Sequence, residues 1–291
     1  MNCDNIIEKA NGIIIKDIHD FGIHETLDNG STFRWFTNGS FHYGVVRNKM
    51  IVVGYVKGTN DLFIGNINKE EFKNYFRYYF DCDTDYDFYY NQIRNDNIEL
   101  QKYLPKQSKL RLVNQDFLES FVCAYISQNN NIERIKQIVY RLCVKLGEPV
   151  EFSGLRSYTF PTLAQLCTLT EDDYKALGFG YRAKGMVVNM NFLASLNVKD
   201  FKEYFSTWEY KEVLGFLMNR QQIGPKVANF IISMSHISKN YEDAFVVDVW
   251  IKRALQDIFG VSYITQEWLD EHFKHKALAQ QNLFYYYRGS K

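Results

Sequence analysis

The apolar pattern of this chain changes its period once, and that change limits the folds the chain can adopt. Residues 33–56, FRWFTNGSFHYGVVRNKMIVVGYV, alternate apolar and polar side chains, with turn signals at Asn38-Gly39 and Gly58. Such alternation predicts an antiparallel sheet with one solvated face. Residues 70–80 have helical spacing, so we expect them to cover the other face.

Later in the chain the apolar residues recur with the period of a helix. Residues 116–127 and 131–147 predict two helices joined by a polar corner. Asp116 and Glu119 predict a capping box at the start of the first helix.

The change of period predicts an α+β fold with two domains. An antiparallel-sheet domain is expected over residues 1–110, and a helical domain over residues 111–291. Pro105 lies in the expected linker.

Composition excludes few functions. The chain has 291 residues, of which 34 are basic and 34 acidic, so its net charge is zero. A DNA-binding protein usually has a basic surplus, and an ordinary enzyme without a nucleic-acid substrate therefore stays open. Phosphate contacts need only a local basic face, however. Aromatic residues reach 16%, and tyrosine and phenylalanine can stack on bases as well as fill a core.

The five cysteines form no CxxC pair, so the sequence predicts neither a disulfide framework nor a zinc or iron–sulfur site. We expect no metal and no organic cofactor. The N-terminus does not resemble a signal peptide, and no stretch approaches the roughly 18 apolar residues of a membrane span. The expected location is intracellular: the cytoplasm of a prokaryote, or the nucleus if the host is eukaryotic.

The segment from Lys211 to Asp248 predicts a helix, a tight turn and a second helix. In the turn RQQIGP, Gly224 is expected to supply an unusual φ angle, and Pro225 suits the first helical position. A helix–hairpin–helix of this kind can present backbone N–H groups to a DNA phosphate, because a helix N-terminus attracts anions.

Lys226 falls in the first turn of the second helix. The positive end of the helix dipole disfavours its ammonium form, and burial against Val227 and Phe230 would act in the same direction. A neutral amine can attack an electrophilic sugar carbon and form a Schiff base. A solvated surface lysine is the plain alternative.

Asp248 follows an apolar run and precedes a segment with helical spacing. It is a candidate N-cap, and in the same place it can orient Lys226 or stabilise positive charge on a sugar.

This hairpin, with its lysine and its downstream aspartate, resembles the helix–hairpin–helix glycosylase superfamily, and within it the 8-oxoguanine DNA glycosylase branch. The resemblance implies an N-terminal antiparallel-sheet domain and an all-helical glycosylase domain. LDNGSTFRW resembles the family's sheet-domain motif, which implies that the carbonyl of Gly30 accepts a hydrogen bond from N7–H of 8-oxoguanine. As an isolated match, Gly30 is a turn glycine.

Two further segments resemble the parts of this family that contact the base opposite the lesion. In SQNNNIERI, Asn129 would fill the gap left by the extruded base, and Arg134 would bind the orphaned cytosine. In LGFGYRAK, Tyr181 would wedge beside that cytosine, and Arg182 would donate to its O2 and N3 atoms. Taken singly, these residues suit a polar loop and a packed surface.

The C-terminal segment ALAQQNLFYYYR resembles the family's base-reading helix. It implies that Gln280 bonds the Watson–Crick edge of the base and that Phe284 stacks on its face. Phe230 stands where eukaryotic members carry a cysteine that packs on the lesion. Gln222 replaces the first glycine of the usual hairpin turn, where Gln222 and Gly224 would contact phosphate, and Trp250 stands where some members have a phosphate-binding histidine.

The implied activity is excision of 8-oxoguanine from double-stranded DNA, opposite cytosine, by a monomer with associated β-elimination at the abasic site. One alternative is a non-catalytic DNA-damage binder built on the same hairpin. Another is a glycosylase for a different lesion, although the alkylated-base type uses no lysine nucleophile. The iron–sulfur endonuclease III type is disfavoured, because no cysteine follows Cys167.

Overall fold

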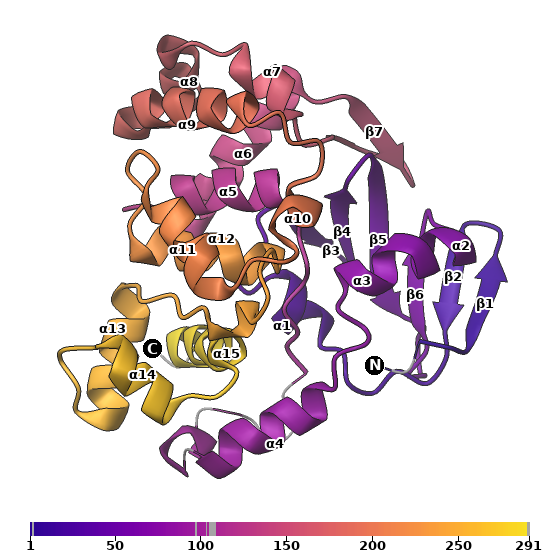
Figure 1. Cartoon of the computed structure of the whole chain (residues 1–291). Coiled ribbons are helices and arrows are strands. Elements are labelled where there is room, and N and C mark those ends of the chain that lie inside the picture. Colours follow the sequence, from indigo (N-terminus) through magenta and orange to yellow (C-terminus); the bar gives the residue numbers. More distant parts are fainter. Residues whose placement is uncertain (2, 97, 103, 105–108, 290–291) are drawn as a thin grey trace.

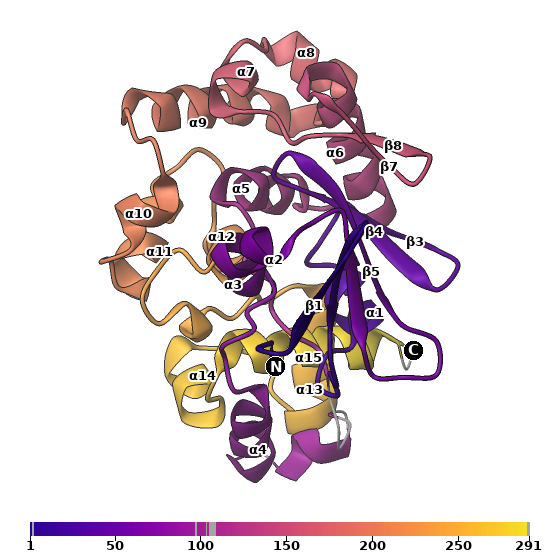
Figure 2. The same ribbon diagram turned by 90° about the vertical axis from the view of Figure 1, so that its right-hand side faces the viewer.

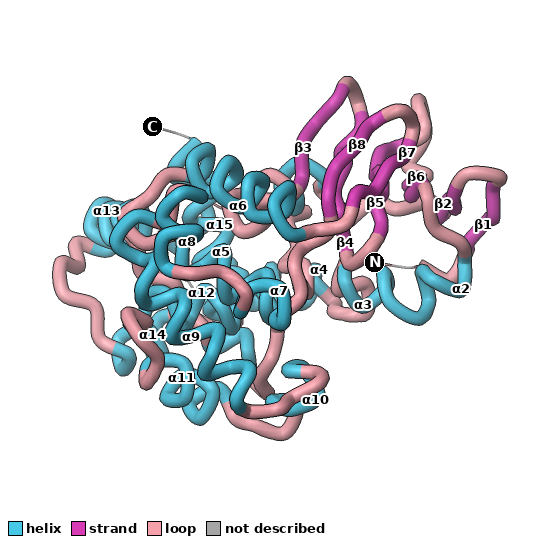
Figure 3. Tube along the Cα trace, turned by 90° about the horizontal axis from the view of Figure 1, so that it is seen from above, coloured by secondary structure: helices cyan, strands magenta, loops and turns pink. Residues whose placement is uncertain are grey.

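The computed structural model describes the chain apart from residues 2, 97, 103, 105–108 and 290–291. The predicted linker residue Pro105 lies outside the described residues. Strands gather at one end of the molecule and helices at the other, as the view from above shows (Figure 3).

The N-terminal sheet has six strands in the spatial order β1-β2-β6-β5-β4-β3, and every neighbouring pair is antiparallel. The strands are β1 (Ile6–Lys9), β2 (Gly12–Ile15), β3 (Trp35–Asn38), β4 (Phe41–Val46), β5 (Lys49–Tyr55) and β6 (Leu62–Gly65). The antiparallel sheet predicted from the alternating pattern is confirmed.

The predicted covering helix over residues 70–80 is also confirmed, with an irregular centre. It consists of α2 (Lys69–Glu71), a π-helical turn (Phe72–Phe76) and α3 (Arg77–Tyr79). Its aromatic side chains share one buried core with the apolar residues of the strands. Figure 2 shows α2 and α3 on one side of the strands.

The rest of the described chain is mainly helical. In the first half it holds α1 (Ile23–Leu27), α4 (Tyr86–Asp96), a 3-10 turn (Ile98–Lys102), α5 (Phe117–Ile126), α6 (Ile132–Leu146), β7 (Pro149–Phe152) and β8 (Leu155–Tyr158). In the second half it holds α7 (Leu163–Cys167), α8 (Glu171–Leu177), a 3-10 turn (Gly180–Arg182), α9 (Ala183–Ser195), α10 (Phe201–Phe205), α11 (Tyr210–Met218), α12 (Pro225–Ser235), a 3-10 turn (Tyr241–Asp243), α13 (Val249–Phe259), α14 (Gln266–His272) and α15 (Lys276–Gly289).

The helices pack around two further cores. One core joins α5, α6, α9, α11 and α12, and almost every residue of α5 is buried in it. The other joins α4 to α13, α14 and α15, which lie together in the lower part of Figure 1. Packing therefore crosses residue 110, and the division of the chain there stays a prediction.

Two local expectations need correction or addition. Asp116 caps α5 by accepting from the backbone N–H of Leu118 and Glu119, but the Glu119 side chain does not complete a capping box. It pairs with Arg34 instead. The helical region also contains the β7–β8 hairpin, whose turn residues Ser153 and Gly154 both have positive φ.

Candidate active site

The predicted hairpin is present, but its unusual backbone lies at a different residue. α12 begins with Pro225 in its first turn after Gly224, whose φ of −96° is ordinary. The residue with positive φ is Gln222, at 58°. The expectation that Gly224 supplies the unusual angle is therefore wrong, because the chain makes its sharp bend two residues earlier.

Lys226 lies in the first turn of α12 and is largely removed from solvent. Its Nζ donates to Ser127 Oγ at 2.8 Å, with the Ser127 carbonyl at 3.4 Å, and lies 5.8 Å from the centre of the Phe230 ring. Burial lowers the pKa of Lys226. The positive charge of Arg182 acts in the same direction, and the negative charge of Asp248 opposes both. A larger fraction of Lys226 is therefore in the neutral amine form than of a solvated lysine at the same pH.

Asp248 caps α13, as the sequence predicted, by accepting from the backbone N–H of Ile251 at 2.8 Å. Burial raises the pKa of Asp248, whereas these helix N–H groups and the charges of Lys226 and Arg288 oppose that rise. The lysine hydrogen-bonds Ser127 rather than Asp248, so the carboxylate acts on it through space. A role for Asp248 in orienting the amine stays a prediction.

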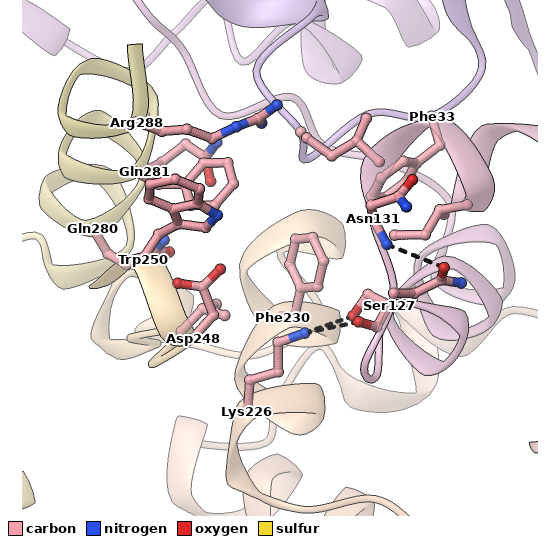
Figure 4. A pocket seen from close by; sticks show the side chains of 16 residues that line it. Phe33, Ser127, Asn131, Lys226, Phe230, Asp248, Trp250, Gln280, Gln281 and Arg288 are labelled. Carbon is pink, nitrogen blue, oxygen red and sulfur yellow. Dashed lines mark hydrogen bonds between the residues drawn. The ribbon is translucent and has the colours of Figure 1, made fainter. Parts of the chain in front are cut away.

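Both side chains point into one pocket of about 290 Å³ between the sheet domain and the helices (Figure 4). Six predicted site residues line it: Gly30, Lys226, Phe230, Asp248, Gln280 and Phe284. They come from the turn before β3, from α12, from the start of α13 and from α15. Segments far apart in sequence therefore converge on one space.

Gly30 lies against the aromatic residue predicted to stack on the base. Its φ is +83°, and a Cβ atom there would come within 2.9 Å of Ile132 Cδ1 and 3.0 Å of Phe284 Cε1. The carbonyls on either side of it are held, since Gln281 donates to Asn29 O and Gln115 donates to Ser31 O, each at 3.0 Å. The turn is therefore fixed with little room beside Gly30.

The FRW motif joins the sheet domain to the helical domain. Phe33 lines the pocket and packs edge-on against Phe230, with ring centres 6.3 Å apart. Arg34 donates to Glu119 at 2.8 Å and to the Tyr158 carbonyl at 2.6 Å. The contact with Glu119 holds this segment against α5, and the contact with Tyr158 holds it against the end of β8.

The residues predicted to read the opposite base lie outside the pocket. Asn129 has a positive φ of 45° and is exposed, as is Arg134 in the first turn of α6. Tyr181 is 58% exposed, whereas Arg182 is buried. The Arg182 guanidinium donates to the carbonyls of Gln128, Asn129 and Phe179 and so holds the corner after α5. Contact of these residues with an opposite base stays a prediction.

Several pocket residues were not predicted as site residues. Ser127 and Asn131 flank the predicted corner, Phe33 belongs to the FRW motif, and Gln281 follows Gln280. Trp250 and Arg288 complete the wall beside Asp248 (Figure 4). Adjacency to a motif could have indicated Ser127 and Gln281. Arg288 is the last residue of ALAQQNLFYYYR, and its spacing of four residues from Phe284 on one helix could have indicated it as well.

The pocket combines aromatic walls, amide groups, a half-buried amine and a half-buried carboxylate. Aromatic and amide groups suit a planar heterocycle, and a neutral amine beside a carboxylate suits attack on a carbon that becomes cationic. In the part of the chain that the structure describes, no cluster of three or more His, Cys, Asp or Glu residues could hold a metal ion. Over the same residues, no helix has the length and apolar character needed to cross a bilayer.

A lysine on a hairpin and an aspartate at the next helix start, facing one pocket, define the class of helix–hairpin–helix base-excision proteins. Residues 122–277 match the family model described as HhH-GPD superfamily base excision DNA repair protein. Because this match covers more than half of the chain, the chain belongs to the HhH-GPD superfamily. Residues 13–121 match the N-terminal domain of 8-oxoguanine DNA glycosylase, so the predicted resemblance to that branch is confirmed.

Individual relatives agree. The chain is 28% identical to an N-glycosylase/DNA lyase of Saccharomyces cerevisiae over 179 residues, which are 58% of this chain and 47% of that protein. It is 27% identical to an N-glycosylase/DNA lyase of Arabidopsis thaliana over 188 residues, 60% of this chain and 51% of that protein. The chain therefore spans about half the length of the curated relatives it matches.

A solved structure covers the whole chain. The 8-oxoguanine glycosylase/lyase of Clostridium acetobutylicum, in complex with double-stranded DNA containing cytosine opposite 8-oxoguanine, superposes with a TM-score of 0.91 and 29% identity. The match covers 100% of this chain and 99% of that one. The likeness extends through both domains.

Proposed function

We propose that this chain is a DNA glycosylase with AP lyase activity that removes 8-oxoguanine from double-stranded DNA. The observation that carries the proposal is the half-buried Lys226 amine, which faces the same pocket as Asp248 and Gln280. The family membership and the similarity to 8-oxoguanine glycosylase/lyases support this substrate.

In the proposed reaction, the Nζ lone pair of neutral Lys226 forms a bond to C1′ as the bond from C1′ to N9 of the base breaks. The electron pair of that bond leaves with the base, which takes up a proton. Asp248 stabilises the positive charge that develops on the sugar. The attached amine then loses its proton and the sugar ring opens to a Schiff base. Loss of a proton from C2′ next expels the 3′ phosphate, which is the β-elimination step.

The base is read by groups that already line the pocket. The Gly30 carbonyl accepts from N7–H, which 8-oxoguanine has and guanine lacks. Gln280 bonds the Watson–Crick edge, while Phe284 and Phe230 contact the base through their rings. The flipped base thereby exchanges its stacking in the duplex for contacts in the protein.

The remaining predicted residues are proposed to hold the DNA. Gln222 and Gly224 present the hairpin turn to a phosphate. Asn129, Arg134, Tyr181 and Arg182 face the opposite cytosine. The protein is proposed to act as a monomer and inside the cell, where its DNA substrate is found.

Borohydride trapping on a duplex with 8-oxoguanine opposite cytosine tests the proposal. The unaltered protein is expected to form a covalent adduct with the DNA, and Lys226→Gln is expected to abolish it. Lys9→Gln, which alters an exposed lysine on β1 remote from the pocket, is the matched control and should leave the adduct unchanged. An adduct that survives Lys226→Gln would refute the assignment of the nucleophile.

Binding measurements, other lesions and other opposite bases extend this experiment and distinguish the alternatives. Tight binding of the duplex with neither excision nor an adduct would support a non-catalytic damage binder. Adduct formation on another lesion, but not on 8-oxoguanine, would support a different substrate. Equal cleavage opposite adenine and cytosine would contradict the opposite-base roles of Arg134 and Arg182.

A further inference from the structure

The hairpin turn contains a non-glycine residue in a conformation that favours glycine. Gln222 has a φ of 58°, in the left-handed region that a side chain with Cβ disfavours. The sequence resemblance places a glycine at this position in most of the family. Some other interaction must therefore hold the turn of this chain in its bent form.

A hydrogen bond from α5 supplies that interaction. The hydroxyl of Tyr125 donates to Gln222 Oε1 at 2.7 Å, over a sequence separation of 97 residues. Tyr125 itself is fully buried in the helical core, so its hydroxyl is held in one place. An otherwise exposed glutamine is thereby tied to a rigid element.

Gly185 of α9 leaves the space in which this bond forms. A Cβ atom at that position would lie 2.1 Å from the Tyr125 hydroxyl and 2.5 Å from Gln222 Oε1. Both distances are shorter than any real Cβ contact. A larger residue at position 185 would displace one of the two bonded groups.

The preceding residue of the turn is held in a similar way. Asn189, also on α9 and buried, donates to the Gln221 carbonyl at 2.9 Å and accepts from the Gln221 N–H at 3.0 Å. Ile223 on the other side of Gln222 packs into the helical core. Three consecutive residues of the turn are therefore fixed by contacts outside the hairpin.

We propose that Tyr125 and Gln222 are positioning residues that preorganise the hairpin turn for a DNA phosphate, in place of the usual glycine. This inference rests on the proposed function, because it requires the turn to bind DNA. Holding the turn before binding lowers the ordering cost that binding must otherwise meet. The same end of α5 carries Ser127, which holds Lys226, so one helix end fixes both the turn and the nucleophile.

The test compares two substitutions at one exposed position. Gln222→Ala removes the hydrogen bond but keeps the strained φ, whereas Gln222→Gly removes the strain as well. The ligand is a duplex with a tetrahydrofuran abasic analogue opposite cytosine. The Kd is expected to rise about 5- to 10-fold for Gln222→Ala, in line with the loss of one hydrogen bond, and to stay within about twofold for Gln222→Gly.

Tyr125→Phe examines the other partner. As a single substitution, Tyr125→Phe should raise the Kd as Gln222→Ala does. Combined with Gln222→Gly, it should have no further effect. Tyr174→Phe is the matched control, because its buried hydroxyl bonds the Leu166 carbonyl away from the hairpin. The slope of log Kd against log salt should become shallower only in the variants that disturb the turn, since a phosphate contact is lost.

The deciding readouts are the Kd and its dependence on salt, because Tyr125 and Gln222 are proposed to act on the binding of a DNA phosphate. An unchanged Kd for Gln222→Ala, or an equal rise for Gln222→Ala and Gln222→Gly, would overturn the proposal. Failure of the proposed function would look different, because the unaltered protein would then form no adduct on 8-oxoguanine DNA.

Discussion

Two physical reasons require glycine at position 30. Their effect on excision can be distinguished by substitution from a general loss of stability. Its positive φ disfavours any Cβ by about 1–2 kcal/mol, and that Cβ would also crowd Phe284 and Ile132. We expect Gly30→Ala to lower the single-turnover excision rate on 8-oxoguanine DNA at least 10-fold, since the carbonyl and the stacking ring would both be displaced. Binding to a duplex with a tetrahydrofuran analogue should change little.

Gly154→Ala is the matched control for this prediction. Gly154 has a φ of +76° and open space around its Cβ position, in the turn between β7 and β8. It carries the same backbone strain without crowding the pocket. Equal losses of excision in the two variants would show that strain alone, rather than the shape of the pocket, explains the effect.

At the scale of residues, the sequence predicted the features that depend on neighbouring residues in the chain. Asp248 was predicted as an N-cap and Pro225 as a first-turn residue, and both are confirmed, because capping depends only on neighbours in sequence. Ser127 as the partner of Lys226, and Tyr125 as the partner of Gln222, join residues about 100 positions apart. No local pattern encodes such pairs.

At the scale of elements, a buried ion pair joins the start of β3 to α5. Arg34 and Glu119 are both nearly inaccessible, with side chains 7% and 13% exposed. Burial raises the pKa of Glu119 despite its partner, and the pKa of Arg34 is raised by the same carboxylate. The pair therefore fixes geometry at a desolvation cost rather than adding much net stability.

Because of this desolvation cost, removing one partner of the pair and replacing both partners are expected to have different effects on stability. Glu119→Leu leaves the Arg34 charge buried without its partner and is expected to lower the free energy of unfolding by about 3–5 kcal/mol. Adding Arg34→Met should recover most of that loss. Urea unfolding measures both. The control is Glu171→Gln, which removes a surface pair with Lys175 from a side chain that is 42% exposed, and it is expected to have little effect. A double variant as unstable as the single one would mean that the pair stabilises the fold outright.

Elements with a strong pattern were predictable, and those fixed by distant contacts were not. The alternation in residues 33–56 identified β3, β4 and β5. The helix over residues 70–80 was predicted, but its π-helical turn was not, since nothing local marks it. Glu119 was assigned to a cap because of its spacing from Asp116, and tertiary pairing with Arg34 overrode that local preference.

At the scale of the whole molecule, packing does not follow the order of the chain. α4 precedes the predicted boundary but shares a core with α13, α14 and α15. The pocket takes its walls from the sheet domain and from both groups of helices. The sequence could predict a sheet domain and a helical domain, but the wrapping of residues 86–96 onto the C-terminal helices depends on contacts almost 200 residues apart.

The C-terminal end of α12 contains a histidine that should make the free energy of unfolding sensitive to acid. His236 ends α12, stacks on Tyr241 with ring centres 3.7 Å apart, and its buried Nε2 has no hydrogen-bond partner among the described residues. Burial lowers its pKa well below the usual value, and the charge of Lys202 acts in the same direction. The backbone N–H of Gln115 donates to the carbonyl of Met234, two residues before His236.

The sign of the pH effect follows from this lowered pKa. Below pH of about 6.5 the unfolded chain binds a proton at His236 that the folded protein does not, so the free energy of unfolding falls as the pH drops. One such group contributes on the order of 1 kcal/mol per pH unit. His236→Asn keeps a residue that tolerates positive φ and should flatten the stability curve between about pH 6.5 and 5, measured by urea unfolding. Tyr241→Phe retains the stacked ring and should keep the original slope. If His236→Asn leaves the slope as steep as before, the acid sensitivity originates in groups other than His236.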